Sequence, residues 1–331
     1  MKTEIVSSRE WVEAVTLLQA GEIVGLPTET VYGLAADALN PIAVAKIFEV
    51  KERPRLDPLI VHLPDRDWLE KIADLPAQDQ KLILKLTDRF WPGPFTIILP
   101  RKSIVPEIVT AGLNTVAVRI SAHPVFIDII QAFGVPLAAP SANRFGRVSP
   151  TTAQHVLDEL NGRIPLIVDA GSTAHGIEST IIAVHGGKID VLRRGPITAE
   201  QLLEFGKIDI VGSKRNISAP GQLPTHYSPK TPLRLIENAN SFSPGKDQRV
   251  GLLAWNRVES EKQFAGVRCL SERQDLREAA ANLFRDLREL DDLDVDFIVA
   301  EQVPDRGLGA AIMDRLQRAA DRPPDAQDRL E

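Results

Sequence analysis

The chain has 331 residues, 44% of them hydrophobic and 25% charged, which is ordinary for a globular protein and enough for two domains with separate cores. A formal net charge of -6 argues against a protein that coats nucleic acid, and the single cysteine, Cys269, excludes an intramolecular disulfide and a cysteine-built zinc site. No stretch reaches the about 20 apolar residues of a membrane helix, and the first residues lack a signal peptide, so we expect a cytoplasmic protein without membrane contact.

The first two-thirds of the chain alternates between helical periodicity and short apolar runs. Ser7 and Glu10 have the spacing of a capping box, and Asn40 and Pro41 suit the cap and first turn of a helix. The pattern predicts a helix that ends at Gly21, a short helix that closes near 205, and helices between them at 41–50, 77–90, 124–133 and 152–160. It predicts strands at 23–26, 59–63, 95–99, 115–120, 136–139, 166–169, 179–184 and 189–192. Some strands are spaced like hairpins, which favours a twisted mixed sheet with flanking helices over a purely parallel sheet.

The composition changes after residue 206. Residues 207–230 are rich in Pro, Gly and Ser and are typical of an ordered linker. The strand and helix pattern then restarts, with strands at 250–255, 267–270 and 297–301 and helices at 276–290 and 309–320. The sequence therefore predicts a larger α/β domain over 1–206, a linker over 207–230, and a smaller C-terminal α/β domain of Rossmann-like type over 231–331.

Three polar loops follow predicted strands, at 27–33, 139–150 and 171–178. Loops that follow the strands of an α/β sheet gather at one edge, where ligands bind. Five cations also lie at or just after strand ends, and they are Lys51, Arg53, Arg119, Arg193 and Arg194. If these ends converge, the resulting cations and hydroxyl groups suit a triphosphate and a carboxylate, without a covalent nucleophile.

Each of these candidates has an ordinary structural alternative. The cations of 51–55 fit a solvated loop, and Arg119 alone fits a surface ion pair. The segment 141–143 fits a simple turn, His62 a core histidine, and Tyr227 a packing anchor. Only a structure in which the loops converge favours a binding site over these alternatives.

Several common sequence motifs are missing. The loop at 171–177 has two glycines at P-loop spacing but has Ile177 where the lysine is required. No G-x-G-x-x-G opens a helix and no G-x-S-x-G is present, which disfavours dehydrogenases and serine hydrolases. His175 and His226 lack metal-ligand spacing, so we assign no metal-ligating residue.

Seven segments together resemble the L-threonylcarbamoyladenylate synthases, the YrdC-like family. They are PTETVYGL (27–34), K-x-R with PLIVH (51–62), WPGPFT (91–96), VAVR (116–119), APSAN with SPT (139–151), GIEST (176–180) and LRRG (192–195). The segment APGQLPTHYSP (219–229) and the trailing α/β domain are similar to the long, two-domain form, in which the linker acts as a lid over the active site.

The resemblance implies an ATP-dependent nucleotidyltransferase. L-threonine, bicarbonate and ATP, with Mg²⁺, would give L-threonylcarbamoyl-AMP and pyrophosphate. A tRNA-modifying transferase complex would then take up this adenylate to modify adenosine 37 in tRNAs that read codons beginning with A.

The resemblance also assigns site residues. Those expected to hold L-threonine are Thr30, His62, Arg119, the backbone at Ala139, and Ser179. Those expected on the ATP side are Lys51, Arg53, Asp57, Thr115, Ser141, Asn143, Ser149, Arg193 and Tyr227, of which Lys51 and Arg53 are the catalytic candidates. Two positions depart from the family pattern, since Asp57 replaces an asparagine and Ser121 replaces a proline.

Two other functions fit parts of the sequence. A module with weak RNA binding would use the arginines at 144, 147, 193 and 194 to meet phosphates, which the acidic net charge disfavours. A carbamoyl-transfer enzyme of the hydrogenase-maturation type shares the domain but needs cysteine-rich zinc fingers, and Cys269 alone does not supply them.

Overall fold

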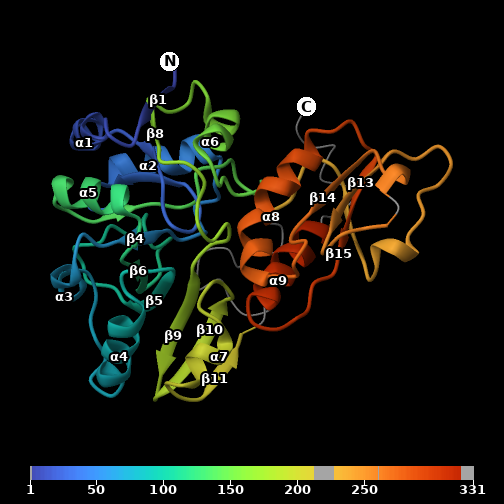
Figure 1. The fold of residues 1–331 in the computed structure, drawn as a ribbon. Helices are drawn as coiled ribbons and strands as arrows, with labels where there is room; N and C mark the ends of the chain where they lie inside the picture. The colour runs from blue at the N-terminus through green and yellow to red at the C-terminus, as the bar shows by residue number, and fades with distance from the viewer. Residues whose placement is uncertain (1, 212–226, 260, 322–331) are drawn as a thin grey trace. The chain divides into compact units, whose positions relative to one another are not determined.

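The structure, a computed structural model, describes residues 2–211, 227–259 and 261–321 (Figure 1). Its contacts group into two units. The N-terminal unit comprises Met1–Phe145 and Ser149–Leu223, and the C-terminal unit comprises Gly146–Val148 and Pro224–Glu331. No helix within the described residues is long and apolar enough to cross a membrane.

The N-terminal unit is built on one sheet, whose described strands run in the order β1-β8-β2-β3-β7-β4-β6-β5-β9-β10-β11. Pairing is antiparallel at β2-β3, β3-β7, β7-β4, β6-β5 and β9-β10 and parallel elsewhere. The strands are β1 (Glu4–Ser7), β2 (Val24–Leu26), β3 (Gly33–Asp37), β4 (Ile60–His62), β5 (Phe95–Pro100), β6 (Thr115–Arg119), β7 (Leu137–Ala138), β8 (Leu166–Asp169), β9 (Thr180–His185), β10 (Lys188–Arg193) and β11 (Ile208–Ile210). The predicted mixed sheet is confirmed.

Helices cover the two faces of this sheet unequally. They are α1 (Val12–Gln19), α2 (Pro41–Lys51), α3 (Leu69–Ile72), α4 (Gln80–Phe90), α5 (Pro124–Phe133), α6 (Ala153–Leu160) and α7 (Ala199–Leu203). One core joins α2, α3, α4, α6 and α7 to one face, whereas α1 and α5 pack on the other face over β2, β3, β7 and β8. Figure 1 shows α1 and α5 toward the part of the sheet that contains β1 and β8, and α4 and α7 toward the part that contains β9–β11.

The face of the sheet that α1 and α5 cover in part also carries, away from these helices, a small apolar cluster made of strand residues. It consists of Ile60, Ala117 and Ile181, with Ile98 and Leu192 packed against them. Because side chains alternate between the faces of a strand, this face also carries Thr115 and Arg119 of β6 and His62 of β4. We call this surface of β4, β6, β5, β9 and β10 the open face.

The N-terminal capping signals in the sequence predict the start of α2 correctly and the start of α1 incorrectly. Asn40 caps α2, since its side chain accepts hydrogen bonds from the backbone N–H groups of Ile42 and Ala43. The capping-box prediction at Ser7 was wrong. The N–H and hydroxyl of Ser7 both donate to the Glu10 carboxylate, over 3.2 and 2.8 Å, but this motif closes the turn after β1, and α1 begins only at Val12.

The C-terminal unit is a second layered α/β structure. Its described strands run in the order β12-β15-β13-β14 and all pair in parallel. They are β12 (Leu233–Ile236), β13 (Val250–Ala254), β14 (Gly266–Cys269) and β15 (Phe297–Glu301), with helices α8 (Leu276–Asp291) and α9 (Leu308–Ala320). The predicted C-terminal α/β architecture is confirmed, although β12 was not predicted.

Two short segments refine the predicted boundaries. Residues 146–148 group with the C-terminal unit, where the backbone N–H of Ser228 donates to the carbonyl of Gly146 over 2.9 Å and the guanidinium of Arg288 donates to the carbonyl of Val148. Within the predicted linker, residues 208–210 form β11 beside β10. Residues 212–226 of the predicted lid lie outside the described residues, whereas 227–230 are described.

Candidate active site

The polar loop at 27–33 contacts the polar loop at 139–150 through its backbone. The N–H of Tyr32 donates to the carbonyl of Pro150, and the N–H of Ala142 donates to the carbonyl of Tyr32, both over 2.9 Å. Gly33 and Ser141 also form an isolated antiparallel bridge. Two loops more than 100 positions apart in the sequence are therefore held side by side.

The third polar loop, at 171–178, joins both of the others. The N–H of His175 donates to the carbonyl of Glu29 over 2.9 Å, and the hydroxyl of Tyr32 donates to the carbonyl of Gly171 over 2.8 Å. The hydroxyl of Ser149 donates to the Glu178 carboxylate over 2.5 Å. The three loops thus converge, as the functional interpretation of the sequence requires.

Arg119 ends β6 among these loops and is 3% exposed. Its Nε donates to the carbonyl of Gly93 and its Nη1 to the hydroxyl of Thr30, both over 3.1 Å. Its Nη2 lies 2.6 Å from a carboxylate oxygen of Glu29. Arg119 does form an ion pair, but both of its partners are buried, so the alternative that Arg119 belongs to a surface ion pair is wrong.

His62 ends β4 directly beside Arg119, since the two residues are partners in the parallel register of β4 and β6. The ring is buried against Phe126 of α5, with ring centroids 4.8 Å apart. Burial, with the positive charge of Arg119, lowers the pKa of His62 to about 3, so the imidazole is neutral. Its Nδ1 has no hydrogen-bond partner among the described residues, unlike the satisfied core histidine of the structural alternative.

Ser179 and Arg193 form the next group, at the start of β9 and the end of β10. Arg193 donates from Nε to the carbonyl and from Nη2 to the hydroxyl of Ser179, both over 3.0 Å. The hydroxyls of Ser179 and Thr96 lie 2.8 Å apart. Since Thr96 follows the turn whose Gly93 carbonyl accepts from Arg119, this group adjoins the Arg119 group.

Lys51 ends α2 and is buried. Its ammonium donates to the carbonyl of Ser141 over 2.6 Å and to the carbonyl of Asn143. Burial, followed by the nearby charge of Arg53, shifts the pKa of Lys51 well below its ordinary value. Lys51 and the 141–143 segment therefore lie together, and the solvated-loop alternative holds only for exposed residues such as Arg55.

Arg53 and Asp57 form a second buried ion pair, with 2.8 Å between Nη2 and a carboxylate oxygen. Arg53 also donates to the backbone carbonyls of Asp57 and Pro58, over 3.1 and 2.8 Å. The aspartate that departs from the family pattern is therefore compensated by Arg53 within the protein.

The remaining ATP-side candidates differ in location. Asn143 and Ser149 are buried in the N-terminal unit. Tyr227 belongs to the C-terminal unit, where its ring stacks on Phe284 with centroids 5.6 Å apart and lies 5.2 Å from the Arg315 guanidinium. The packing-anchor alternative for Tyr227 fits this arrangement, and its role at ATP stays a prediction.

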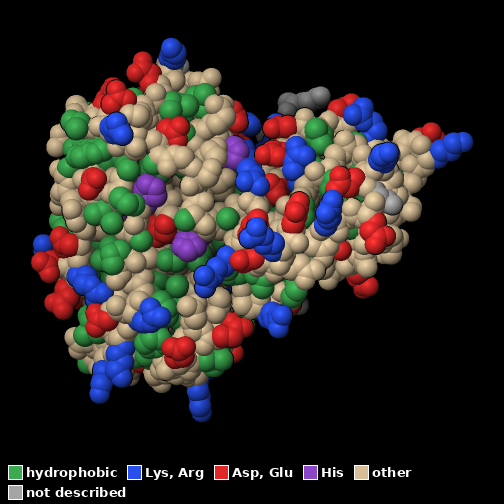
Figure 2. Space-filling view, viewed as in Figure 1, with side chains coloured by type: hydrophobic (Ala, Val, Ile, Leu, Met, Phe, Trp, Pro, Cys, Tyr) green, Lys and Arg blue, Asp and Glu red, His purple; other side chains and the backbone are tan. Residues whose placement is uncertain are grey.

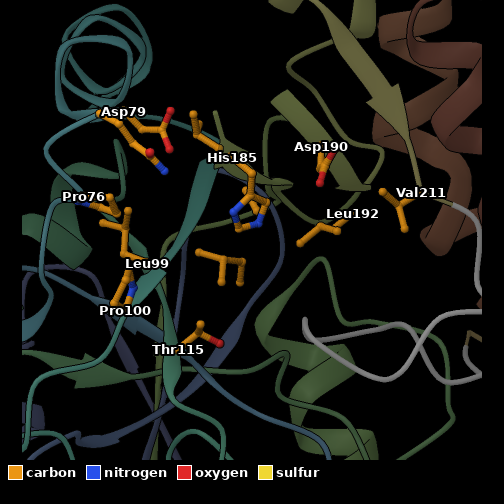
Figure 3. A pocket seen from close by; sticks show the side chains of 13 residues that line it. Pro76, Asp79, Leu99, Pro100, Thr115, His185, Asp190, Leu192 and Val211 are labelled. Carbon is orange, nitrogen blue, oxygen red and sulfur yellow. The ribbon is translucent and has the colours of Figure 1, made fainter. Parts of the chain in front are cut away.

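A cavity of about 310 Å³ lies on the open face. Figure 3 shows Thr115 and Pro100 on one side of it, and His185, Asp190 and Leu192 on the other. Its walls are mainly apolar, since Ile98, Leu99, Ala183 and Val184 also contribute. Thr115 is the one sequence-predicted site residue among its lining residues, and it lies on β6 with Arg119 on the same face.

Glu29 and Ser121 were missed as site residues by sequence reasoning. The hydroxyl of Ser121 donates to a Glu29 carboxylate oxygen over 2.5 Å, while the other oxygen faces Arg119. Burial alone would raise the pKa of Glu29, but the charge of Arg119 and the hydrogen bond from Ser121 outweigh it and lower the pKa to about 2. The departure from proline at 121 was the available signal.

The arginines considered for RNA binding are partly used inside the protein. Arg144 pairs with Glu159 over 3.4 Å, and Arg193 is bound to Ser179. On the face shown in Figure 2, blue and red side chains are interspersed over the surface rather than separated into a basic tract. This surface lacks the pattern typical of a phosphate-tracking groove.

The fold and the site define a YrdC-like α/β protein with a buried cationic site formed by strand-end loops. A family sequence profile described as "Telomere recombination", that of Sua5, YciO and YrdC, matches residues 16–195, and one described as "Threonylcarbamoyl-AMP synthase, C-terminal domain" matches residues 197–321. The chain therefore belongs to the Sua5/YciO/YrdC family, in its two-domain form.

Individual relatives cover nearly the whole chain. The Threonylcarbamoyl-AMP synthase of Bacillus subtilis is 42% identical over 93% of this chain and 92% of its own length. The protein of the same name from Pyrococcus abyssi is 37% identical over 96% and 98%. The crystal structure of P. abyssi Sua5 complexed with L-threonine aligns with a TM-score of 0.86 and 34% identity, over 97% of this chain and 98% of that one.

Proposed function

We propose that this protein is an enzyme that makes L-threonylcarbamoyl-AMP and pyrophosphate from L-threonine, bicarbonate and ATP. The observation that carries the proposal is the convergence of the loops around Arg119, Ser179 and Lys51 into one buried, cationic and hydroxyl-rich site. The names of relatives that align over almost the whole chain support the same activity here.

One end of the site suits L-threonine. Arg119 has more N–H groups than its three contacts use, so it can take the substrate carboxylate. The neutral His62 offers Nδ1 as an acceptor for the hydroxyl of threonine, and the hydroxyls of Thr30 and Ser179 with the backbone at Ala139 complete the pocket. The threonine bound in the P. abyssi structure supports this assignment.

The other end suits ATP. Arg53 and Arg193 supply positive charge for a triphosphate, and a bound triphosphate would favour the protonated form of the buried Lys51. Each of the three side chains is already held by a backbone carbonyl group. Ser141, Asn143 and Ser149 add donors from the loop at 139–150. The apolar cavity beside Thr115 has room for a nucleoside, which supports a position for the base on the open face.

The chemistry needs positioning rather than a protein nucleophile. The threonine amine attacks bicarbonate, and loss of water gives a carbamate. A carbamate oxygen then attacks the α-phosphorus of ATP, and the bond to the leaving pyrophosphate breaks. Buried Lys51 and Arg53 stabilise the charge that develops on the phosphates, and burial of the loops keeps water from the unstable carbamate.

Mg²⁺ would enter with the triphosphate. Among the described residues no group of three His, Cys, Asp or Glu side chains is placed to hold a metal. Mg²⁺ in phosphoryl-transfer sites commonly keeps water and substrate phosphates as ligands, with few from the protein. The cationic donor set of this site is consistent with binding the metal as its ATP complex.

The product predicts the next reaction. A mixed anhydride between a carbamate and AMP is an activated acyl donor, which suits a tRNA-modifying transferase acting at adenosine 37. We propose that such a transferase consumes the adenylate.

The test is pyrophosphate release with each of L-threonine, bicarbonate and ATP omitted in turn. We expect release only when all three are present, with the threonylcarbamoyl adenylate detected by mass spectrometry. Release that is indifferent to threonine would overturn the proposal, and salt-sensitive RNA binding without turnover would favour the RNA-binding alternative instead.

A further inference from the structure

Glu29 is a buried acidic side chain placed directly against the candidate carboxylate-binding arginine. One of its oxygens lies 2.6 Å from Nη2 of Arg119. The other accepts from the hydroxyl of Ser121 over 2.5 Å, and the same hydroxyl accepts from the N–H of His123 over 3.3 Å. Glu29 and Ser121 are 8% and 2% exposed.

This carboxylate is a poor proton acceptor. With its pKa lowered to about 2, Glu29 stays ionised throughout the neutral range and is too weak a base to deprotonate an amine there. Its function must therefore come from its fixed charge and its contacts, and not from proton transfer.

Its contacts fix the plane of the Arg119 guanidinium. Gly93 and Thr30 accept hydrogen bonds from two nitrogens of Arg119, and Glu29 forms an ion pair at the third. Glu29 and Thr30 are neighbours in one loop, and Gly93 belongs to a second segment of the chain. A planar guanidinium with two nitrogens in hydrogen bonds and the third in an ion pair has little freedom to rotate, so its remaining N–H groups keep one direction. Ser121 in turn holds Glu29 from the opposite side.

We propose that Glu29 and Ser121 are positioning residues that aim Arg119 at the carboxylate of the amino-acid substrate. The inference rests on the proposed function for the identity of that substrate. Ser121 supplies a hydroxyl where the family pattern has a proline, so this chain carries a second support for the arginine.

Charge alone predicts the opposite outcome, which makes the test sharp. Replacing Glu29 by glutamine removes a negative charge beside Arg119, and Coulomb attraction alone would then tighten binding of an anionic carboxylate. Weaker binding of threonine, with binding of a ligand that lacks the carboxylate unchanged, is expected only if Glu29 is needed to orient the guanidinium. The sign of the change in threonine affinity therefore distinguishes the positioning role of Glu29 from a purely electrostatic effect of its charge.

The experiment measures binding to the full chain by calorimetry, for L-threonine and for L-threoninamide, in which a neutral amide group replaces the carboxylate. We expect Glu29→Gln to weaken threonine binding at least tenfold while threoninamide changes less than threefold. Ser121→Ala should weaken threonine binding about threefold, and Ser121→Thr, which keeps the hydroxyl, should restore it. Glu22→Gln, at an exposed ion pair with Lys46, is the matched control and should change neither ligand.

Each outcome decides a different question. Equal losses for threonine and threoninamide in Glu29→Gln, or unchanged or tighter threonine binding, overturn the positioning role. If Glu29→Gln does not fold, as judged by its melting curve, Ser121→Ala and Ser121→Thr decide it, because the first removes only the hydroxyl and the second keeps it. A wild-type protein that does not prefer threonine to threoninamide would overturn the proposed function itself, and with it this inference.

Discussion

Glu29 in the N-terminal unit and Asp286 in the C-terminal unit are both buried carboxylates paired with an arginine, yet their pKa values move in opposite directions. The pKa of Glu29 is lowered to about 2 against the effect of burial. Burial raises the pKa of Asp286 to about 6, although Arg285 lies 2.9 Å away. One oxygen of Asp286 has no hydrogen-bond partner among the described residues.

The difference lies in the partners, since Glu29 has both the charge of Arg119 and a hydrogen bond from Ser121. The Arg119 side chain is 3% exposed, whereas that of Arg285 is 45% exposed. An ion pair is strong only where water is excluded from both charges, so an exposed arginine does not offset the desolvation of a buried carboxylate. The N-terminal unit buries complementary charges together, as a preorganised binding site requires, and α8 of the C-terminal unit does not.

If the buried charges of the N-terminal unit serve phosphate chemistry, Lys51 should have the largest effect on turnover. We expect Lys51→Ala to lower kcat about 100- to 1,000-fold, corresponding to the roughly 3–4 kcal/mol that a preorganised charge contributes to a transition state. Pyrophosphate release at saturating substrates measures it, and Arg55→Ala, an exposed cation four residues away, is the control. A loss below threefold would remove Lys51 from the catalytic machinery.

Arg119 should affect binding rather than chemistry. We expect Arg119→Ala to weaken L-threonine binding by about 2–3 kcal/mol, or about 30- to 150-fold, because a buried charge-assisted contact is lost. Calorimetric titration with threonine measures this change, with Arg66→Ala as an exposed control. Unchanged threonine affinity would show that the carboxylate binds elsewhere.

The open face should give a smaller effect, on ATP alone. Leu192→Asp places a carboxylate in the wall of the apolar cavity, and we expect KM for ATP to rise about tenfold, with threonine binding unchanged. Leu203→Asp, at an exposed position on α7, controls for the added charge. If both variants keep the wild-type KM for ATP, the nucleoside does not occupy this cavity.

The sequence predicted the elements whose residues carry a strong pattern. Strands rich in Val, Ile and Leu, such as β13, and the Asn40 cap of α2 were found from local signals. β3 was missed because its sequence, Gly-Leu-Ala-Ala-Asp, has little strand preference, and it is a strand because β2 and β7 pair with both of its edges. Local composition does not report such tertiary pairing.

The candidate site divides in the same way. The types of residue at Lys51, Arg119 and Ser141 predicted a cationic, hydroxyl-rich site. Their partners could not be predicted, because Glu29 and Arg119 are separated by 90 positions and meet only through the order of the strands. The stacking partner of Tyr227, Phe284, could not be predicted either, since the two residues are far apart in the sequence.

Asp286→Asn should have the smallest effect on activity and a measurable effect on stability. The pKa of Asp286 is 3.8 in the unfolded chain and about 6 in the folded protein. At a pH between these two values, the folded protein therefore binds a proton that the unfolded chain does not. The stability of the wild type therefore falls as pH rises through this window, and the fall is nearly complete about one pH unit above the folded pKa. The asparagine variant lacks this penalty, so its free energy of unfolding should be about 1–3 kcal/mol higher than that of the wild type at pH 7, and the difference should shrink toward zero below pH 4.

Denaturant unfolding of both proteins across this pH range measures the difference. The exposed Asp294→Asn is the control, and pyrophosphate release by Asp286→Asn is expected to be unchanged. A loss of stability at pH 7 would mean that Arg285 does compensate the buried charge, and that the contrast with Glu29 does not depend on the burial of the arginine.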